Sequence, residues 1–153
     1  MAKVLRFVLI ALLFACDSTR VFEEFHSLNQ WAENDSQSFD FSVEDDKQAY
    51  NLVAQFKYDM AFSYQNFYFQ VKLEDERDSV LLDELHEVIF FEPKTGRPEG
   101  DGVGSAFDIS HPIQTAFVFP NKGAYSISYQ QYMRVDTLSD ILKTGFRLEK
   151  NIQ

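Results

Sequence analysis

The clearest pattern in the sequence is a strict alternation of apolar and polar positions over several short stretches. Between Asn66 and Leu73, phenylalanine and aliphatic residues occupy every second position, opposite Tyr68, Gln70 and Lys72. Because successive side chains of a strand point to opposite faces, a period of two predicts a strand with one buried face. The stretches 39–43 and 50–58 alternate in the same way.

Other stretches extend this pattern to most of the chain. Further strands are expected over 21–25, 88–91, 107–109, 115–119, 124–133 and 146–152. The turn-forming residues 120–123 lie between two of them, which predicts a hairpin. Residues 80–87 fit either a strand or a helical turn, and 138–142 resemble a short turn that Gly145 ends. Residues 93–104 hold four of the six glycines and are expected to form one long irregular loop.

About eight or nine short strands with almost no helical periodicity predict an all-β protein. Such a chain forms a sandwich or a barrel. We favour a single β-sandwich, jelly-roll-like, of about eight strands. Residues 16–153 have the length of one domain.

The beginning of the chain has the plan of an export signal. Lys3 and Arg6 precede an apolar run over 7–15, which ends in Leu13-Phe14-Ala15-Cys16. Nine apolar residues are too few for a membrane-spanning helix, which needs about 20. The arrangement resembles the lipobox of bacterial lipoproteins, in which the cysteine is lipidated and becomes the new N-terminus. We therefore expect a signal peptide over 1–15 and a lipid-anchored domain over 16–153. The alternative is a cytosolic protein with an inert cysteine, which the abrupt polarity after Cys16 disfavours.

The net charge of the chain limits the classes of partner that it is expected to bind. The sequence has 14 Lys and Arg against 24 Asp and Glu, and removal of residues 1–15 brings the net charge from −10 to −12. Such an acidic surface repels nucleic acid and anionic headgroups. Attachment to a membrane is therefore expected through lipid on Cys16 and not through a basic patch. The single cysteine also excludes an internal disulfide.

No constellation of residues predicts catalysis or metal binding. The candidate bases are His26, His86 and His111, and Ser105 lies near the last of them without a nucleophile-elbow motif. The histidines lack metal-ligand spacing, and there is no CxxC motif. Asp101 could help to bind Ca²⁺ in the glycine-rich loop, but tight turns explain those glycines more simply. We predict no catalytic residues, no metal site and no cofactor.

Aromatic side chains offer one binding hypothesis. Trp31, Tyr64, Tyr68 and Tyr132 could be exposed and stack on sugar rings. Most of the other aromatic residues fall on the alternating apolar faces and are expected in the core. An envelope-tethered carbohydrate-binding β-sandwich is therefore the alternative function.

The C-terminal third carries the most specific resemblance to a known family. The ordered motifs are Gly123-x-Tyr125, Gln130-Gln131, Met133-Arg134-Val135-Asp136-x-Leu138 and Gly145-x-Arg147-Leu148-Glu149-Lys150. Upstream pieces agree in order, including Val21-Phe22 soon after Cys16, Trp31, Asn66-x-Tyr68 and Pro93-x-Thr95-Gly96. Together they resemble the GldH gliding-motility lipoproteins of Bacteroidetes.

The resemblance implies a non-enzymatic envelope protein that supports the gliding machinery, which works alongside the type IX secretion system. Its expected partners are the membrane, through lipidated Cys16, and other gliding or secretion proteins. The resemblance implies a periplasm-facing location and leaves the choice of inner or outer membrane open. It implies no catalytic residues and gives no reason to expect a small-molecule ligand.

Overall fold

The computed structural model describes residues 19–152, and these residues contain strands and no helix. No segment among them could therefore cross a bilayer as a helix. The strands are β1 (Arg20–Ser27), β2 (Trp31–Ala32), β3 (Ser36–Val43), β4 (Ala49–Asp59), β5 (Asn66–Asp75), β6 (Val80–Ile89), β7 (Asp101–Val103), β8 (Ala106–Val118), β9 (Gly123–Gln131), β10 (Thr137–Leu138) and β11 (Ile141–Lys150).

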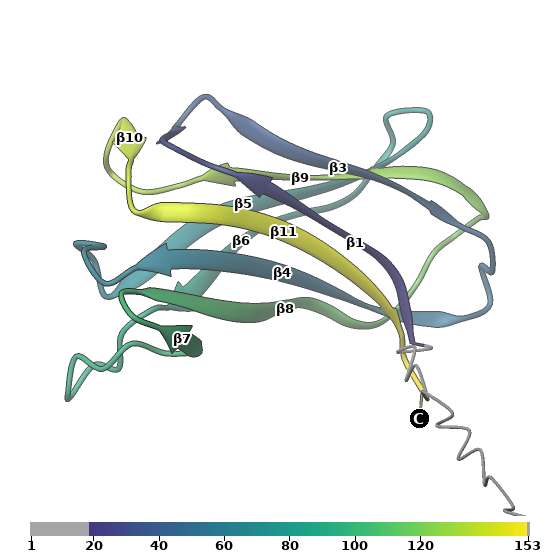
Figure 1. Cartoon of the computed structure of the whole chain (residues 1–153). Helices are drawn as coiled ribbons and strands as arrows, with labels where there is room; N and C mark the ends of the chain where they lie inside the picture. Colours follow the sequence, from purple (N-terminus) through teal and green to yellow (C-terminus); the bar gives the residue numbers. More distant parts are fainter. Residues whose placement is uncertain (1–18, 153) are drawn as a thin grey trace, which may run out of the picture.

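Eight long strands form two antiparallel sheets that face each other (Figure 1). One sheet has the order β1-β11-β4-β8, extended by the short β7, and the other has the order β3-β9-β5-β6. Apart from the β5–β6 hairpin, each long strand is followed along the chain by one in the opposite sheet. This is the jelly-roll arrangement, and the predicted all-β sandwich is confirmed.

The alternating positions build the core between the sheets. On β5, Phe67, Phe69, Val71 and Leu73 are all fully buried, while the residues between them are half-buried on the outer face. Phe56 of β4 lies with its ring centroid 4.9 Å from that of Phe69, edge to face, which joins the two sheets. The period of two in the sequence thus identifies the inner face of each central strand.

Trp31 belongs to this core and not to the surface. Its side chain is 0% exposed, its ring lies 5.6 Å from that of Phe67, and its Nε1–H donates to the carbonyl oxygen of Asp35 at 2.7 Å. It also pairs with Leu138, so that β2 and β10 form a small ladder. The possibility that Trp31 is an exposed sugar-stacking platform is therefore wrong.

The hairpin expected around residues 120–123 is also wrong. The chain reverses there, but β8 pairs with β4 and β7 while β9 pairs with β3 and β5. Phe119 is 1% exposed and lies 5.6 Å from Tyr50 and 4.7 Å from Tyr125, between residues of the two sheets. Because this ring is buried between the sheets, the chain turns from one sheet to the other here and does not form a hairpin within a sheet.

Two other strands, β6 and β8, are longer than the sequence pattern suggests, and a third, β7, is not expected from it at all. β6 is one continuous strand, which settles the ambiguity at residues 80–87, and β8 runs without a break through Pro112. Proline fits there because β7 pairs with β8 only at residues 106–108, which leaves the edge beside Pro112 open. The glycine-rich loop contains β7, which the sequence pattern does not reveal.

Gly145 lies inside β11 and does not end a turn. It pairs with Phe25 of β1, whose ring covers it: a Cβ at this position would lie 2.5 Å from Phe25 Cδ1. Glycine is thus favoured here, because a larger residue would have to displace the Phe25 ring.

Tyr58 fixes the glycine-rich loop to the sandwich. Its hydroxyl lies 2.6 Å from the carbonyl oxygen of Phe90 and 2.7 Å from that of Glu99, and its single proton is shared between them. The ring stacks on Phe90 at 4.1 Å. Burial raises the pKa of Tyr58 to about 12, so the hydroxyl remains a donor at any physiological pH.

The first described residues lie at one end of the sandwich. The Lys150 N–H at the end of β11 donates to the carbonyl oxygen of Thr19 at 2.7 Å. The other end of β11 follows β10, at the opposite end of the molecule in Figure 1. Ten strand residues span roughly 30 Å, so these two ends are well separated.

Candidate functional site

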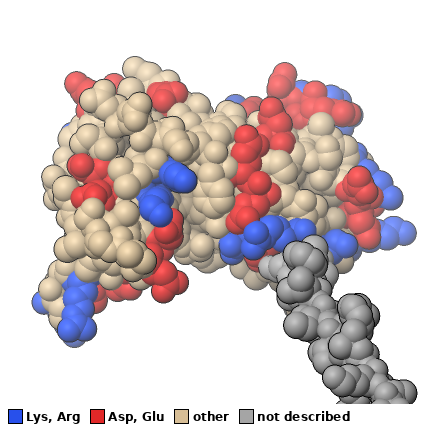
Figure 2. Space-filling view, viewed as in Figure 1, with Lys and Arg blue, Asp and Glu red and all other residues tan. Residues whose placement is uncertain are grey.

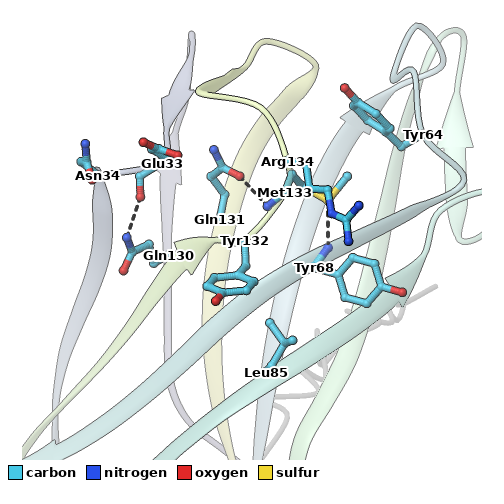
Figure 3. A pocket seen from close by; sticks show the side chains of 10 residues that line it. All are labelled: Glu33, Asn34, Tyr64, Tyr68, Leu85, Gln130, Gln131, Tyr132, Met133 and Arg134. Carbon is cyan, nitrogen blue, oxygen red and sulfur yellow. Dashed lines mark hydrogen bonds between the residues drawn. The ribbon is translucent and has the colours of Figure 1, made fainter.

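A groove lies on the outer face of the β3-β9-β5-β6 sheet, at the end of the sandwich opposite Thr19 (Figures 1 and 3). Its volume is about 800 Å³, which lies within the range of ligand sites in proteins. The residues that line it are Glu33, Asn34, Tyr64, Tyr68, Leu85, Gln130, Gln131, Tyr132, Met133 and Arg134. We call this feature the aromatic groove.

The aromatic groove combines residues from separate parts of the chain. Tyr68 faces outward from β5, opposite the buried phenylalanines, and Leu85 faces outward from β6. Tyr132 follows β9, and Tyr64 lies in the turn before β5. Tyr132 is 62% exposed, Leu85 51% and Tyr64 38%, so apolar side chains are accessible along the groove. Three of the four candidate aromatic platforms therefore lie together, and Trp31 alone is elsewhere.

Tyr68 is held in a fixed position by two polar neighbours. Its hydroxyl donates to Glu87 Oε1 at 2.9 Å, and Asn66 Nδ2 donates to the Tyr68 hydroxyl oxygen at 3.1 Å and to the same Glu87 oxygen at 2.6 Å. The bond to Glu87 raises the pKa of Tyr68, and the bonds from Asn66 and Tyr68 lower the pKa of Glu87. The ring is thus oriented before any ligand arrives.

The backbone around Tyr132 is fixed as well. The side chain of Gln131 is buried, donates to the Val135 carbonyl at 2.9 Å and accepts the Met133 N–H at 2.9 Å. The Tyr132 N–H donates to the Tyr68 carbonyl at 2.8 Å, and the Met133 sulfur accepts the Tyr68 N–H at 3.3 Å. These bonds hold the turn after β9 against β5 and leave the ring of Tyr132 exposed (Figure 3).

Polar atoms with free hydrogen-bonding capacity lie beside the rings. Gln130 donates from Nε2 to the Glu33 carbonyl at 2.6 Å, and its Oε1 accepts no bond within residues 19–152. Over the same residues, the side chains of Asn34 and Arg134 have neither a hydrogen-bond partner nor an ion-pair partner. Figure 3 shows these groups along the groove, with Tyr132 between Gln130 and Tyr68.

The candidate catalytic residues are not arranged as a nucleophile hydrogen-bonded to a base. His86 Nδ1 lies 3.2 Å from His111 Nε2, which joins β6 to β8, and Glu84 lies 3.5 Å from the other nitrogen of His86. Burial lowers the pKa of both His86 and His111; Glu84 opposes this for His86, and the charge of His86 adds to it for His111. Ser105 instead donates to Asp59 at 2.7 Å.

The remaining candidate residues lie apart from one another. His26 stacks on Phe39 at 4.5 Å and contacts Gln37 at 3.2 Å. Asp101 starts β7, and residues 19–152 contain no group of three or more His, Cys, Asp or Glu that could hold a metal ion. Cys16 and the expected signal peptide lie outside the described residues.

The chain matches the model of the family described as GldH lipoprotein over residues 20–148. This match covers well over half of the sequence. The chain belongs to the GldH lipoprotein family.

Two curated relatives agree with this assignment. A protein of Christiangramia forsetii named "Gliding motility lipoprotein GldH homolog" is 26% identical, over 95% of this chain and 93% of that protein. A protein of Flavobacterium johnsoniae named "Gliding motility lipoprotein GldH" is 28% identical, over 91% of this chain and 90% of that protein. Among solved structures, dimeric latent PorU from Porphyromonas gingivalis matches 84% of this chain and 12% of that chain with 7% identity, and the TM-score is 0.32.

Proposed function

We propose that this protein is a lipid-anchored component of the cell envelope that supports gliding motility without catalysing a reaction. The observation that carries the proposal is the match to the GldH lipoprotein family over residues 20–148, together with two relatives named for gliding motility. The lipobox-like stretch before Cys16, the only cysteine of the chain, supports the lipid anchor.

The fold suits attachment through Cys16. Thr19 follows Cys16 by three residues, which span at most about 11 Å when extended. The end of the sandwich that carries Thr19 would therefore lie close to the bilayer. The aromatic groove lies at the opposite end and would be held away from the membrane by the length of the strands.

The face near Thr19 that Figure 2 shows has no uniformly basic patch. Figure 2 shows basic and acidic side chains intermixed at this end of the molecule. A depression there is lined by Arg20 and Lys150 together with Glu44 and Asp45, so its formal charges balance. A surface without a basic patch gains little from anionic lipids, and the lipid on Cys16 would supply the attachment.

A role through protein contacts fits the family better than catalysis does. Within the described residues, Ser105 bonds to Asp59 and to no histidine, His26 contacts Gln37, and His86 and His111 contact each other. The aromatic groove contains no histidine, serine or cysteine. We further propose that the protein faces the periplasm and works with the gliding proteins that are associated with type IX secretion.

Deletion of the gene in the source bacterium tests the proposal. We expect loss of colony spreading, with restoration by the wild-type gene and not by a gene encoding Cys16→Ser. Secretion of type IX cargo into the medium is measured in the same strains. Normal spreading of the deletion strain would refute the gliding role, and lost spreading with normal secretion would refute the link to type IX secretion.

A further inference from the structure

The structure assigns a binding role to the aromatic groove: it binds a neutral oligosaccharide chain. This inference goes beyond the proposed gliding function and does not depend on it, because it stands on the contents of the groove alone. The groove is open and is lined both by flat aromatic rings and by polar atoms that have no hydrogen-bond partner among the described residues.

The flat surfaces come from the tyrosines. The face of a sugar ring carries C–H groups, and an exposed aromatic ring buries them well at little cost in conformational entropy. Tyr132 is 62% exposed although its backbone is held by Tyr68, and the Tyr68 hydroxyl is itself fixed by Glu87. The Tyr68 ring and the backbone that carries Tyr132 are positioned before binding, and with Tyr64 at one end the three rings offer stacking sites to a chain of sugars.

The free polar atoms match sugar hydroxyl groups. A hydroxyl both donates and accepts, so it needs donors and acceptors close together. Arg134 supplies guanidinium donors, Asn34 supplies an amide donor and acceptor, and Gln130 Oε1 supplies an acceptor. None of these atoms is used by other residues among those described. Planar amide and guanidinium groups can each contact two neighbouring hydroxyls at once.

The charge of the groove favours a neutral chain. Its only charged side chains are Glu33 and Arg134, one of each sign. The protein around it is strongly acidic, with 24 Asp and Glu against 14 Lys and Arg, which disfavours a polyanion such as an acidic polysaccharide.

The backbone beneath the groove favours a sugar over a peptide. A bound peptide strand commonly adds to a free sheet edge, where its main chain finds hydrogen bonds. β9 and β5, which underlie most of the groove, are central strands paired on both sides, and only β6, which carries Leu85, lies at the edge of the sheet. Over β9 and β5, recognition therefore comes from side chains, as in the stacking and hydroxyl contacts described above.

Isothermal titration calorimetry on the full lipidated chain tests the inference. The chain is kept in a zwitterionic detergent without a sugar headgroup and titrated with cellotetraose, xylotetraose, mannotetraose and chitotetraose. We expect at least one of them to bind with a Kd of about 1 mM or tighter. Binding of chitotetraose alone would assign an N-acetylated chain, and binding of the others a chain recognised by hydroxyls only.

Variants locate the binding. We expect Tyr132→Ala to weaken it at least about tenfold, through loss of a stacking surface, and Tyr132→Phe to keep it. Arg134→Ala removes donors and should also weaken binding. The matched control is Phe25→Ala, which removes an exposed ring from β1, on the other sheet.

Three results would overturn the inference. The first is no heat and no chemical-shift change with any tetrasaccharide at about 10 mM. The second is binding that both Tyr132→Ala and Arg134→Ala leave unchanged. The third is a library-selected peptide that occupies the groove while no tetrasaccharide binds, which would make the groove a protein-docking site. Each result is independent of whether a deletion strain glides.

Discussion

Replacement of Trp31 by alanine tests how this sandwich is closed at the end that carries the aromatic groove. The indole is 0% exposed, contacts Phe67 and donates to the Asp35 carbonyl at 2.7 Å. Its strand pairs with β10, and the turn that follows it carries Glu33 and Asn34 of the groove. The substitution removes the largest buried side chain of the region together with a hydrogen bond.

The expected cost follows from this burial. Truncation of a buried tryptophan to alanine typically lowers the free energy of unfolding by about 3–5 kcal/mol, because the transfer energy is lost and a cavity remains. For a domain of this size, that corresponds to a decrease in Tm of about 10–15 °C. Trp31→Phe keeps most of the apolar area and loses the bond to Asp35, so we expect a cost of about 1–2 kcal/mol.

Chemical denaturation followed by far-ultraviolet circular dichroism measures these values without relying on tryptophan fluorescence. Tyr132→Ala serves as the exposed control and should change stability by less than about 0.5 kcal/mol. If Trp31→Ala destabilises the protein by less than about 1 kcal/mol, the buried position of the indole is wrong and the original hypothesis of an exposed platform returns.

Three further predictions concern other parts of the fold. The pKa values of His86 and His111 are lowered in the folded protein, so the unfolded chain, with a histidine pKa near 6.5, binds protons first as the pH falls. The free energy of unfolding should therefore decrease from pH 7.5 to pH 5. Replacing both residues with glutamine should flatten this decrease. A steeper decrease in the double variant would contradict the assignment. Gly145→Ala should cost about 1–3 kcal/mol by overpacking against Phe25, and adding Phe25→Ala should recover part of it in a double-mutant cycle; strictly additive costs would refute the contact. Tyr58→Phe should cost about 1 kcal/mol and speed amide hydrogen exchange in residues 93–104, whereas unchanged exchange would show that the hydroxyl does not hold this loop.

The parts of the fold that the sequence predicts are those where one face of a strand is buried. Phe67 to Leu73 alternate strictly because β5 lies at the centre of its sheet, with the core on one side and solvent on the other. β6 is an edge strand, so Asp83, Glu84 and Glu87 interrupt its apolar positions and the helical alternative looks equally good. Local periodicity is weaker in an edge strand, which has solvent on its outer face and along its open edge.

Long-range pairing leaves much less trace in the sequence. The turn at residues 120–123 predicts a reversal correctly but contains nothing that specifies which sheet the next strand joins. That choice depends on Phe119, whose burial between the sheets is visible only in three dimensions.

In the candidate site, too, the sequence indicates individual residues but not how they come together. Tyr64, Tyr68 and Tyr132 could be singled out as aromatic residues near polar neighbours, but their proximity depends on the turn that Gln131 holds in place. Trp31 could not be distinguished from them, because two-residue β2 is too short for alternation to show which way its side chains point. Arg134 and Asn34 lie in turns, where no periodic pattern marks a functional residue.

The central claim is that Cys16 tethers this sandwich to a membrane, and mass spectrometry of the protein purified from the envelope tests it most directly. We predict that the mature chain begins at Cys16, that its N-terminal peptide carries diacylglycerol on the thiol, and that Cys16→Ser yields an unacylated chain that retains residues 1–15. A wild-type chain that begins at Met1, with a free thiol at Cys16, would contradict the account.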